Sequence, residues 1–272
     1  MNAALLKPPS PPRFTPGERR SLATLLAPLD DAAVRSDHLF RHNSYQAGDD
    51  QVLPRYLYLG ERGGGDVIRL GIFATIHGDE PEGALALGRL VTLLDRNPDL
   101  ARGYALFLYP VCNPGGFEDG TRHSRTGQDL NRMFWKASSE PEVRFLESEI
   151  CLHAFHGIVT LHSDDTSDGL YGYVNGAVLS EHLLEPALRE AERFLPRNRG
   201  GVIDGFAARN GIIYESYDGV LRSVPGLGRP PFELTLETPQ AAALHLQVDA
   251  MTAALQTILV EYRYLVAVAQ NI

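Results

Sequence analysis

The sequence between residues 67 and 94 reads VIRLGIFATIHGDEPEGALALGRLVTLL, and this stretch decides the fold class. Residues 67–76 are a near-continuous apolar run bounded by turn residues, which is typical of a strand buried on both faces. From Pro81 onward, leucines recur at helical spacing on a broad apolar face, and a proline in the first turn suits a helix start. A buried strand, a polar turn and a helix together predict a βα unit.

The same alternation continues on both sides of this unit. We expect further strands over residues 51–60, 104–111, 157–161 and 231–237, and helices over 139–155, 178–195 and 239–269. Residues 113–136 are expected to form a long polar loop, and residues 200–230 an irregular region with short strand candidates. The pattern predicts an α/β fold, a single domain with a mixed, largely parallel central sheet flanked by helices on both faces.

The N-terminal part differs in composition from the rest of the chain. Five prolines fall between positions 8 and 16, and residues 17–40 are expected to form one or two short polar helices. We therefore divide the chain into a proline-rich segment with short helices over residues 1–50, packed on the domain, and a main domain over residues 51–272.

Composition and charge exclude several classes of protein. The 272 residues are 44% hydrophobic and 22% charged, values that exclude a disordered or fibrous chain. The formal net charge of -9 argues against a nucleic-acid partner, which requires clustered Lys and Arg. Two cysteines without a C-x-x-C pair, no signal-peptide core and no long apolar stretch predict a cytoplasmic protein with no membrane partner. The oligomeric state is left open.

Polar side chains follow the expected strands, where the carboxyl ends of parallel strands place ligand sites. They are His77, Asn113, His162 and Glu237. Glu80 stands three residues after His77, so both side chains can face one crevice, and His162 follows 82 residues after Glu80 at the end of another strand. Two imidazoles and one carboxylate suit a zinc ion. The spacing excludes the arrangement in which both histidines lie on one helix.

Five pieces of sequence carry a resemblance to a known family. They are HGDE at 77–80, NPGG at 113–116, RHSRTGQDLNR at 122–132, LHS at 161–163 and TLE at 235–237. In these pieces and in their order, the sequence resembles the carboxypeptidase A-type zinc metallopeptidase superfamily, near the succinylglutamate desuccinylase/aspartoacylase-like branch. The resemblance spans residues 71–239 and implies a zinc carboxypeptidase-like catalytic domain.

The resemblance implies a role for each matching residue. His77, Glu80 and His162 are the implied ligands of one Zn²⁺ per chain. Asp129 is the carboxylate that accepts a hydrogen bond from the first zinc histidine and fixes its tautomer. Arg122 matches the arginine that polarises the scissile carbonyl.

The resemblance also implies which residues bind the substrate and which residue transfers the proton. Asn131 and Arg132 match the pair that binds the free carboxylate of the substrate, for which a guanidinium offers two parallel hydrogen bonds. Glu237 matches the general base. Glu233 lies on the same face of the same expected strand and is an alternative base, although Glu237 aligns with the T-x-E of the family.

Other positions leave alternatives open. Arg125 competes with Arg122 for the oxyanion role, but spacing favours Arg122. Two tyrosines, Tyr214 and Tyr217, are candidates for the residue that closes over the substrate. The family pattern is also broken at two places, where Ser124 replaces an asparagine and Thr160 an acidic residue.

These features predict a zinc-dependent metallocarboxypeptidase-type hydrolase, a metallopeptidase that cleaves an amide or peptide bond next to a free carboxylate by means of zinc-activated water. The substrate is then a peptide or small molecule with a free carboxylate. An alternative is an N-acyl amino acid amidohydrolase of the succinylglutamate desuccinylase/aspartoacylase type. A second alternative is a non-catalytic carboxylate-binding protein. The compact length favours the peptidase.

Overall fold

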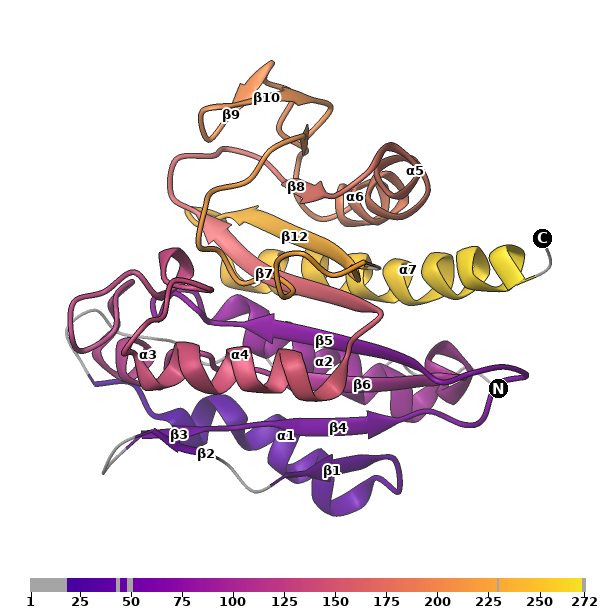
Figure 1. The fold of residues 1–272 in the computed structure, drawn as a ribbon, viewed down its shortest axis with the longest axis horizontal. Helices are drawn as coiled ribbons and strands as arrows, with labels where there is room; N and C mark the ends of the chain where they lie inside the picture. The colour runs from indigo at the N-terminus through magenta and orange to yellow at the C-terminus, as the bar shows by residue number, and fades with distance from the viewer. Residues whose placement is uncertain (1–18, 43–44, 48–50, 229, 271–272) are drawn as a thin grey trace.

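A ten-stranded mixed sheet runs through the protein. The computed structural model describes residues 19–42, 45–47, 51–228 and 230–270 (Figure 1). In sheet order the strands are β1 (Leu39–Arg41), β4 (Tyr56–Leu59), β6 (Tyr104–Tyr109), β5 (Ile68–Ala74), β7 (Gly157–Asp164), β12 (Phe232–Pro239), β8 (Tyr171–Val174), β11 (Ile212–Ile213), β10 (Phe206–Arg209) and β9 (Val202–Ile203). A separate pair is formed by β2 (Tyr45–Ala47) and β3 (Gln51–Leu53).

The middle of the sheet is parallel and its flanks are mostly antiparallel. Strands β6, β5, β7 and β12 run in the same direction. Nearly every residue of β5 and β7 is buried, as expected of strands covered on both faces. Because the four strands are parallel, their carboxyl ends meet at one edge of the sheet, where ligand sites form in such folds.

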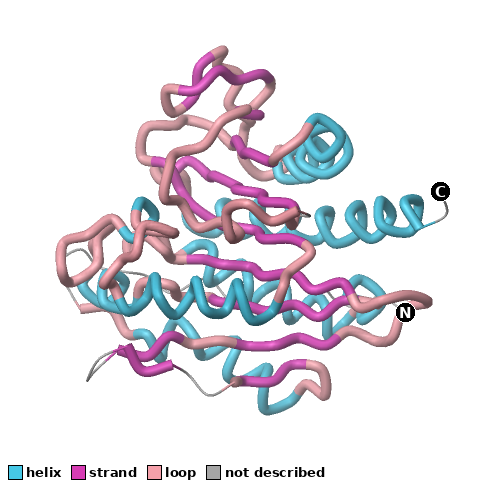
Figure 2. The backbone as a smooth tube through the Cα atoms, in the orientation of Figure 1, coloured by secondary structure: helices cyan, strands magenta, loops and turns pink. Residues whose placement is uncertain are grey.

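Helices cover both faces of this sheet (Figure 2). They are α1 (Leu22–Arg35), α2 (Glu82–Arg96), α3 (Pro114–Asp119), α4 (Pro141–His153), α5 (Ala177–Leu179), α6 (Glu185–Ala191) and α7 (Leu244–Gln270), with 3-10 turns at Pro98–Ala101 and Leu130–Arg132 and a π-helical turn at Ser180–Leu184. On one face α1 packs on α2, α2 on α7 and α7 on α6, and their apolar side chains share one core with the sheet. On the other face, α4 contributes Val143, Phe145 and Leu146 to a second core.

The α/β class, the mixed sheet and the helices on both faces are confirmed, but the parallel share is smaller than expected. Among the described strands of the large sheet, five neighbouring pairs are antiparallel and four are parallel. The difference arises at the flanks, where short strands of two to four residues add antiparallel pairs. Strands this short carry too little periodicity to be recognised in sequence, and β8 was not expected at all.

The expected polar loop over residues 113–136 contains more structure than predicted. Asn113 opens α3, because its side chain accepts a hydrogen bond from the amide of Gly116 at 2.9 Å. Residues 22–41 contribute α1 and the edge strand β1 to the same fold, whereas the prolines at positions 8–16 lie outside the described residues.

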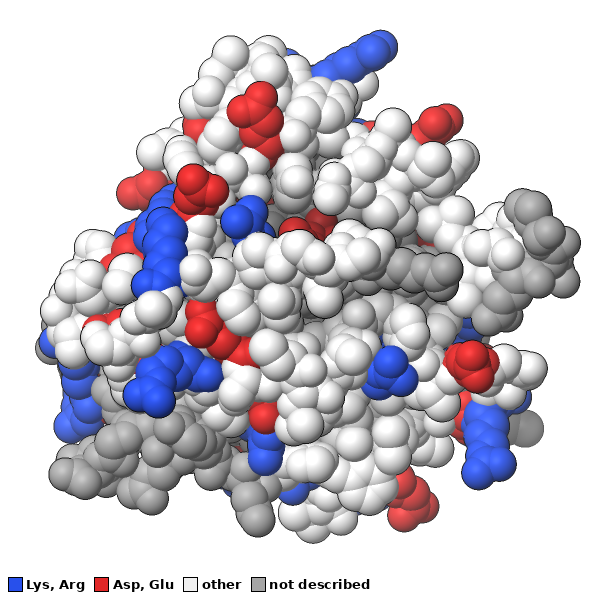
Figure 3. Space-filling view, viewed as in Figure 1, with Lys and Arg blue, Asp and Glu red and all other residues white. Residues whose placement is uncertain are grey.

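The distribution of surface charge and the hydropathy of the helices are relevant to nucleic-acid and membrane partners. On the face shown in Figure 3, basic and acidic side chains are interspersed and form no continuous basic patch. No helix in the described part of the chain combines the length and the hydropathy that a membrane crossing requires.

Candidate metal centre and pocket

Three strands deliver the polar residues that the sequence singles out. His77 follows the end of β5, His162 lies near the end of β7, and Glu237 lies near the end of β12. In the sheet register, Glu237 of β12 stands opposite His162 of β7. The parallel packing of β5, β7 and β12 therefore places these residues at one edge.

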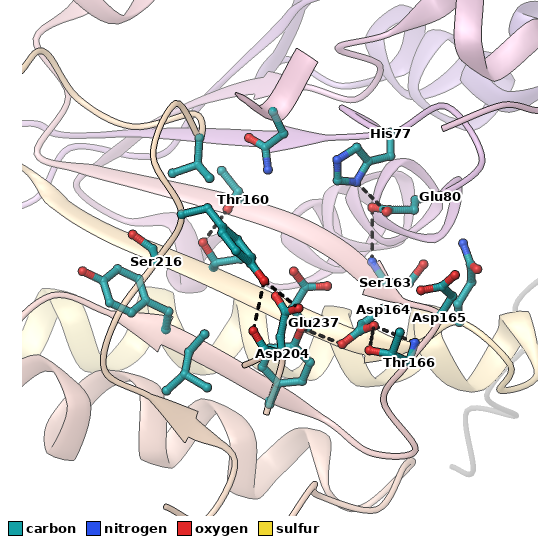
Figure 4. Close-up of a pocket in the computed structure, with 18 of the residues that line it drawn as sticks. His77, Glu80, Thr160, Ser163, Asp164, Asp165, Thr166, Asp204, Ser216 and Glu237 are labelled. Carbon is teal, nitrogen blue, oxygen red and sulfur yellow. Dashed lines mark hydrogen bonds and ion pairs between the residues drawn. The ribbon is translucent and has the colours of Figure 1, made fainter. Parts of the chain in front are cut away.

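His77, Glu80 and His162 form a buried cluster of possible metal ligands. One donor atom from each residue lies within 4.8 Å of the others. The Nδ1 atom of His77 lies 2.6 Å from Glu80 Oε1, and the Nδ1 atom of His162 lies 3.1 Å from Glu80 Oε2. The two imidazoles therefore face the same carboxylate through the same kind of nitrogen. Figure 4 shows the contact of His77 with Glu80.

The segment from Thr75 to Glu80, which carries two of the candidate ligands, is strained at Thr75 and crowded at Gly78. Thr75 has a positive φ of 52°, and its hydroxyl donates to the backbone carbonyl of Glu80 at 3.0 Å. A Cβ atom at Gly78 would lie 2.0 Å from the carbonyl carbon of Gly116, so only glycine fits where the loop meets α3. Strain of this kind commonly occurs at functional sites.

The charges of the cluster are strongly coupled. Burial would raise the pKa of Glu80, but the charge of His77 and the hydrogen bond of His162 outweigh it and lower that pKa to about 2. Burial would lower the pKa of His77, but Glu80 and Asp129 outweigh it and raise that pKa to about 9. The pKa of His162 is lowered by burial, which favours the neutral imidazole that binds metals.

Asp129 and Arg122 extend the cluster toward solvent. Asp129 Oδ1 lies 3.3 Å from His77 Nε2, and its Oδ2 accepts from the Nη2 atom of Arg122 at 3.1 Å. The Nη1 atom of Arg122 lies 3.6 Å from Glu80 Oε1. Arg122 lines the pocket, whereas Arg125 pairs with Glu118 and Asp119 outside it, so the structure brings only Arg122 to the site.

A pocket of about 320 Å³ lies beside this cluster. Asn131 and Arg132 line it, and the side-chain oxygen of Asn131 accepts from the backbone amide of Leu221 at 2.8 Å. The guanidinium of Arg132 lies over the ring of Tyr217, 4.2 Å from the ring centroid. The guanidinium group of Arg132 is therefore stacked on the aromatic face of Tyr217.

The two glutamates of β12 have different surroundings. Glu237 lines the pocket, and its pKa is raised by burial and by the nearby charges of Glu80, Asp164 and Asp204. Figure 4 shows its carboxylate in the pocket, below His77 and Glu80. Glu233 lies outside this pocket and accepts from the backbone amide of Ser223 at 2.9 Å.

The two tyrosine candidates are separated as well. Tyr217 lines the pocket, and its hydroxyl lies 3.0 Å from Asp204 Oδ1. Tyr214 is 56% exposed and does not line the pocket.

Sequence reasoning missed Asp164, Tyr171 and Asp204, all of which line the pocket. Asp164 accepts from the Tyr171 hydroxyl at 2.8 Å. Asp164 could have been found, since it ends the strand that carries His162. Asp204 and Tyr171 lie in or beside strands too short to be predicted.

Comparisons with known proteins agree with this geometry. Residues 66–194 match the family model described as the succinylglutamate desuccinylase/aspartoacylase catalytic domain. The match covers 129 of the 272 residues, a little under half of the chain, and makes this part of the chain similar to that catalytic domain. A search of curated protein sequences finds no match.

Solved structures of metallopeptidases and metallo-carboxypeptidases share the fold. A protein from Shewanella amazonensis assigned as a metallopeptidase is 23% identical, with a TM-score of 0.74 and coverage of 88% of this chain and 92% of that chain. A metallo-carboxypeptidase from Burkholderia cenocepacia is 16% identical, with a TM-score of 0.69 and coverage of 91% and 70%. A metallo-carboxypeptidase from Pseudomonas aeruginosa in complex with (2-guanidinoethylmercapto)succinic acid is 20% identical, with a TM-score of 0.62 and coverage of 89% and 69%.

The donor set of His77, Glu80 and His162 fits a metal ion. Two imidazole nitrogens and a carboxylate are a zinc-type set, and three protein ligands leave a position for water or substrate. Asp129 stands at the far nitrogen of His77, where a carboxylate would keep the proton on Nε2 and leave Nδ1 free to bind.

Proposed function

We propose that the protein is a zinc-dependent hydrolase, a metallocarboxypeptidase-type enzyme that cleaves an amide or peptide bond next to a free carboxylate. The observation that carries the proposal is the buried cluster of His77, Glu80 and His162 at the edge of a pocket that also holds Glu237 and Arg132. A similar fold from Pseudomonas aeruginosa binds a succinic acid derivative, which supports a substrate with a carboxylate.

His77, Glu80 and His162 would hold the ion. When bound, zinc would lower the pKa of a water molecule to about 7 and polarise the scissile carbonyl. Asp129 orients the His77 ring from the opposite side.

Glu237 moves the proton in this proposal. It takes a proton from the attacking water and delivers it to the nitrogen of the leaving amine, so that the amide becomes a carboxylic acid and an amine. Its raised pKa supports the delivery step, because a carboxyl group with an elevated pKa holds the transferred proton more readily until the amine takes it.

Arg122 and Arg132 would interact with the two negative charges of the reacting substrate, on the carbonyl oxygen and on the free carboxylate. Arg122 lies against Glu80 and Asp129, where its guanidinium can stabilise the negative charge that develops on the carbonyl oxygen. Arg132, fixed over Tyr217, presents donors to the free carboxylate, and Asn131 lies next to it.

A second candidate is an N-acyl amino acid amidohydrolase. The match of residues 66–194 to the succinylglutamate desuccinylase/aspartoacylase catalytic domain favours it. The same residues would serve, since both reactions hydrolyse an amide near a carboxylate. The two candidates differ in whether the substrate is a peptide or an acylated amino acid.

A substrate panel tests the proposal. The zinc-loaded protein is assayed with peptides that carry a free C-terminal carboxylate, with the same peptides amidated, and with N-acyl amino acids. We expect substrates with a free carboxylate to be hydrolysed much faster than their amides. The replacement Glu237→Gln is expected to lower kcat by about 10²–10⁴-fold, the range for a general base, while the zinc content stays unchanged.

Glu233→Gln is the matched control, because Glu233 lies on the same strand outside the pocket. It is expected to keep kcat within a few-fold of the parent. If the zinc-loaded protein binds members of the panel but hydrolyses none, the enzyme proposal is wrong and a carboxylate-binding protein is favoured instead. Equal loss in both variants would reject Glu237 as the base.

A further inference from the structure

The loop that carries His77 and Glu80 is attached to the segment before α1. We call residues 76–80 the ligand loop. The Nη1 atom of Arg20 donates to the backbone carbonyl of Gly78 at 3.2 Å. Gly78 lies between the two candidate ligands of this loop, so the contact reaches the loop at its middle.

Arg20 is itself fixed against α3. Its backbone amide donates to the carbonyl of Glu118 at 2.7 Å, and its guanidinium carbon lies 5.8 Å from the centroid of the Phe117 ring. A Cβ atom at Gly120 would lie 3.4 Å from Arg20 Nε, so the side chain also rests on the end of α3. Arg20 therefore spans α3 and the ligand loop.

The ligand loop and α3 are packed too closely to move independently. The first turn of α3 stands directly against Gly78, and the amide of Gly78 donates to the carbonyl of Arg122 at 3.3 Å. The side-chain amide of Asn113, at the start of α3, donates to the carbonyls of Ile76 and Arg122, each at 3.3 Å. A shift of α3 would consequently move His77 relative to His162, which lies on a separate strand.

Acidic residues lie near the buried part of Arg20. Burial lowers the pKa of Arg20, and the nearby carboxyl groups of Asp79 and Glu82 offset part of this shift. Asp79 belongs to the ligand loop, and Glu82 belongs to the first turn of α2. Arg20 therefore lies near acidic residues that come just before and just after Glu80 in the chain.

We propose that Arg20 is a positioning residue of the metal centre, which sets the spacing of the candidate ligands by joining the ligand loop to α3. The inference rests on the proposed zinc site and assigns a role there to a residue outside the five sequence pieces that resemble the family. Partners that orient metal ligands commonly change metal affinity by about 10–100-fold when they are removed.

The zinc dissociation constant of the full chain is measured by competition with a chromophoric chelator, for the parent and for Arg20→Ala. We expect Arg20→Ala to bind zinc about 10–100-fold more weakly. Arg20→Lys keeps the charge and one donor, and is expected to regain part of the affinity.

Arg19→Ala is the matched control. Arg19 is the neighbouring residue and pairs with Glu118 at 2.9 Å on the surface, so its loss should leave zinc affinity within about twofold. The midpoint of thermal unfolding of each metal-free variant separates positioning from a loss of folding. If Arg20→Ala fails to fold, the zinc dissociation constant of Arg20→Lys is compared with that of the parent instead.

The outcomes separate the inference from the proposed function. If the parent binds no zinc, the proposed function is wrong as well. If the parent binds zinc and the folded Arg20 variants bind it equally tightly, only the inference is wrong. A lowered unfolding midpoint with unchanged zinc affinity would likewise overturn it, because Arg20 would then act on the fold alone.

Discussion

The two sides of the pocket are built in different ways. The side with the candidate metal ligands is formed by His77, Glu80 and His162, which are almost completely buried. His77 and Glu80 lie between β5 and α2, and His162 lies near the end of β7. The opposite side is formed by residues 204–221, where Asp204 has a positive φ of 51° in a turn and Tyr217 is 37% exposed. One side rests on the core of the fold, and the other rests on short strands and turns at its flank.

Hydrogen bonding shows the same contrast. Glu80 alone contacts two histidines and accepts from the backbone amide of Ser163 at 3.2 Å, all within the buried cluster. Hydrogen bonds near the C-terminal end of residues 204–221 hold the opposite side. The amide of Leu221 donates to the side chain of Asn131, and the amide of Phe134 donates to the carbonyl of Gly219 at 3.0 Å. A reaction centre that must stay fixed uses the core, while a surface that recognises different substrates can change on loops.

The largest effect is expected on the ligand side. His162→Ala removes one of three donors, so zinc affinity should fall by more than the roughly 10–100-fold that follows loss of an outer partner. Hydrolysis should fall with it. Metal analysis of the purified protein and turnover with the best substrate of the panel measure both effects.

His182→Ala provides the control, since His182 is exposed and belongs to no ligand cluster among the described residues. It should keep both zinc and activity. Retention of a full zinc equivalent by His162→Ala would show that the ion binds elsewhere and would break the contrast between the two sides.

A smaller effect is expected where the pocket would bind the substrate carboxylate. Arg132→Ala removes a charged hydrogen bond worth about 1.5–3 kcal/mol. The corresponding fall in kcat/KM is about 10–150-fold, and we expect it mainly as a rise in KM. Steady-state kinetics with the free-carboxylate substrate measures this change.

An uncharged analogue of the substrate sharpens this result. If Arg132 reads the carboxylate, amidation and Arg132→Ala should not have additive effects, because each removes the same contact. Fully additive losses would mean that Arg132 acts through Tyr217 or the backbone and not on the substrate.

The contrast also explains what could be predicted from the sequence. Strands β5 and β7 are long buried runs and β12 alternates buried and half-buried residues, so the three strands and the polar residues at their ends were expected. The candidate ligands follow from these strand ends and from their spacing. Their proximity in the structure depends on the parallel pairing of the same three strands.

The flank could not be predicted in the same way. Strands β8 to β11 are two to four residues long, and Asp204 reaches the pocket through their hairpins. The choice between Tyr214 and Tyr217 depends on the backbone conformation of the turn that carries them. The spacing of apolar residues in the sequence does not predict that conformation. Arg20 was also missed, because its contact with Gly78 joins residues 58 positions apart without any motif.

The smallest effect is expected at Tyr217. Tyr217→Phe keeps the ring over Arg132 and removes only the hydroxyl that meets Asp204, a contact worth about 1 kcal/mol. We therefore expect a change in KM of about fivefold with little change in kcat, since the loss loosens the turn without touching the metal ligands.

Tyr214→Phe is the matched control, because Tyr214 lies on the same loop, is exposed and does not line the pocket. Its kinetic constants should stay within twofold of the parent. A fall in kcat with Tyr217→Phe as large as that with Glu237→Gln would contradict this view, since it would place the hydroxyl in the reaction and not in the support of the turn. The flank would then share in the chemistry, and the division between a fixed catalytic side and an adaptable recognition side would not hold.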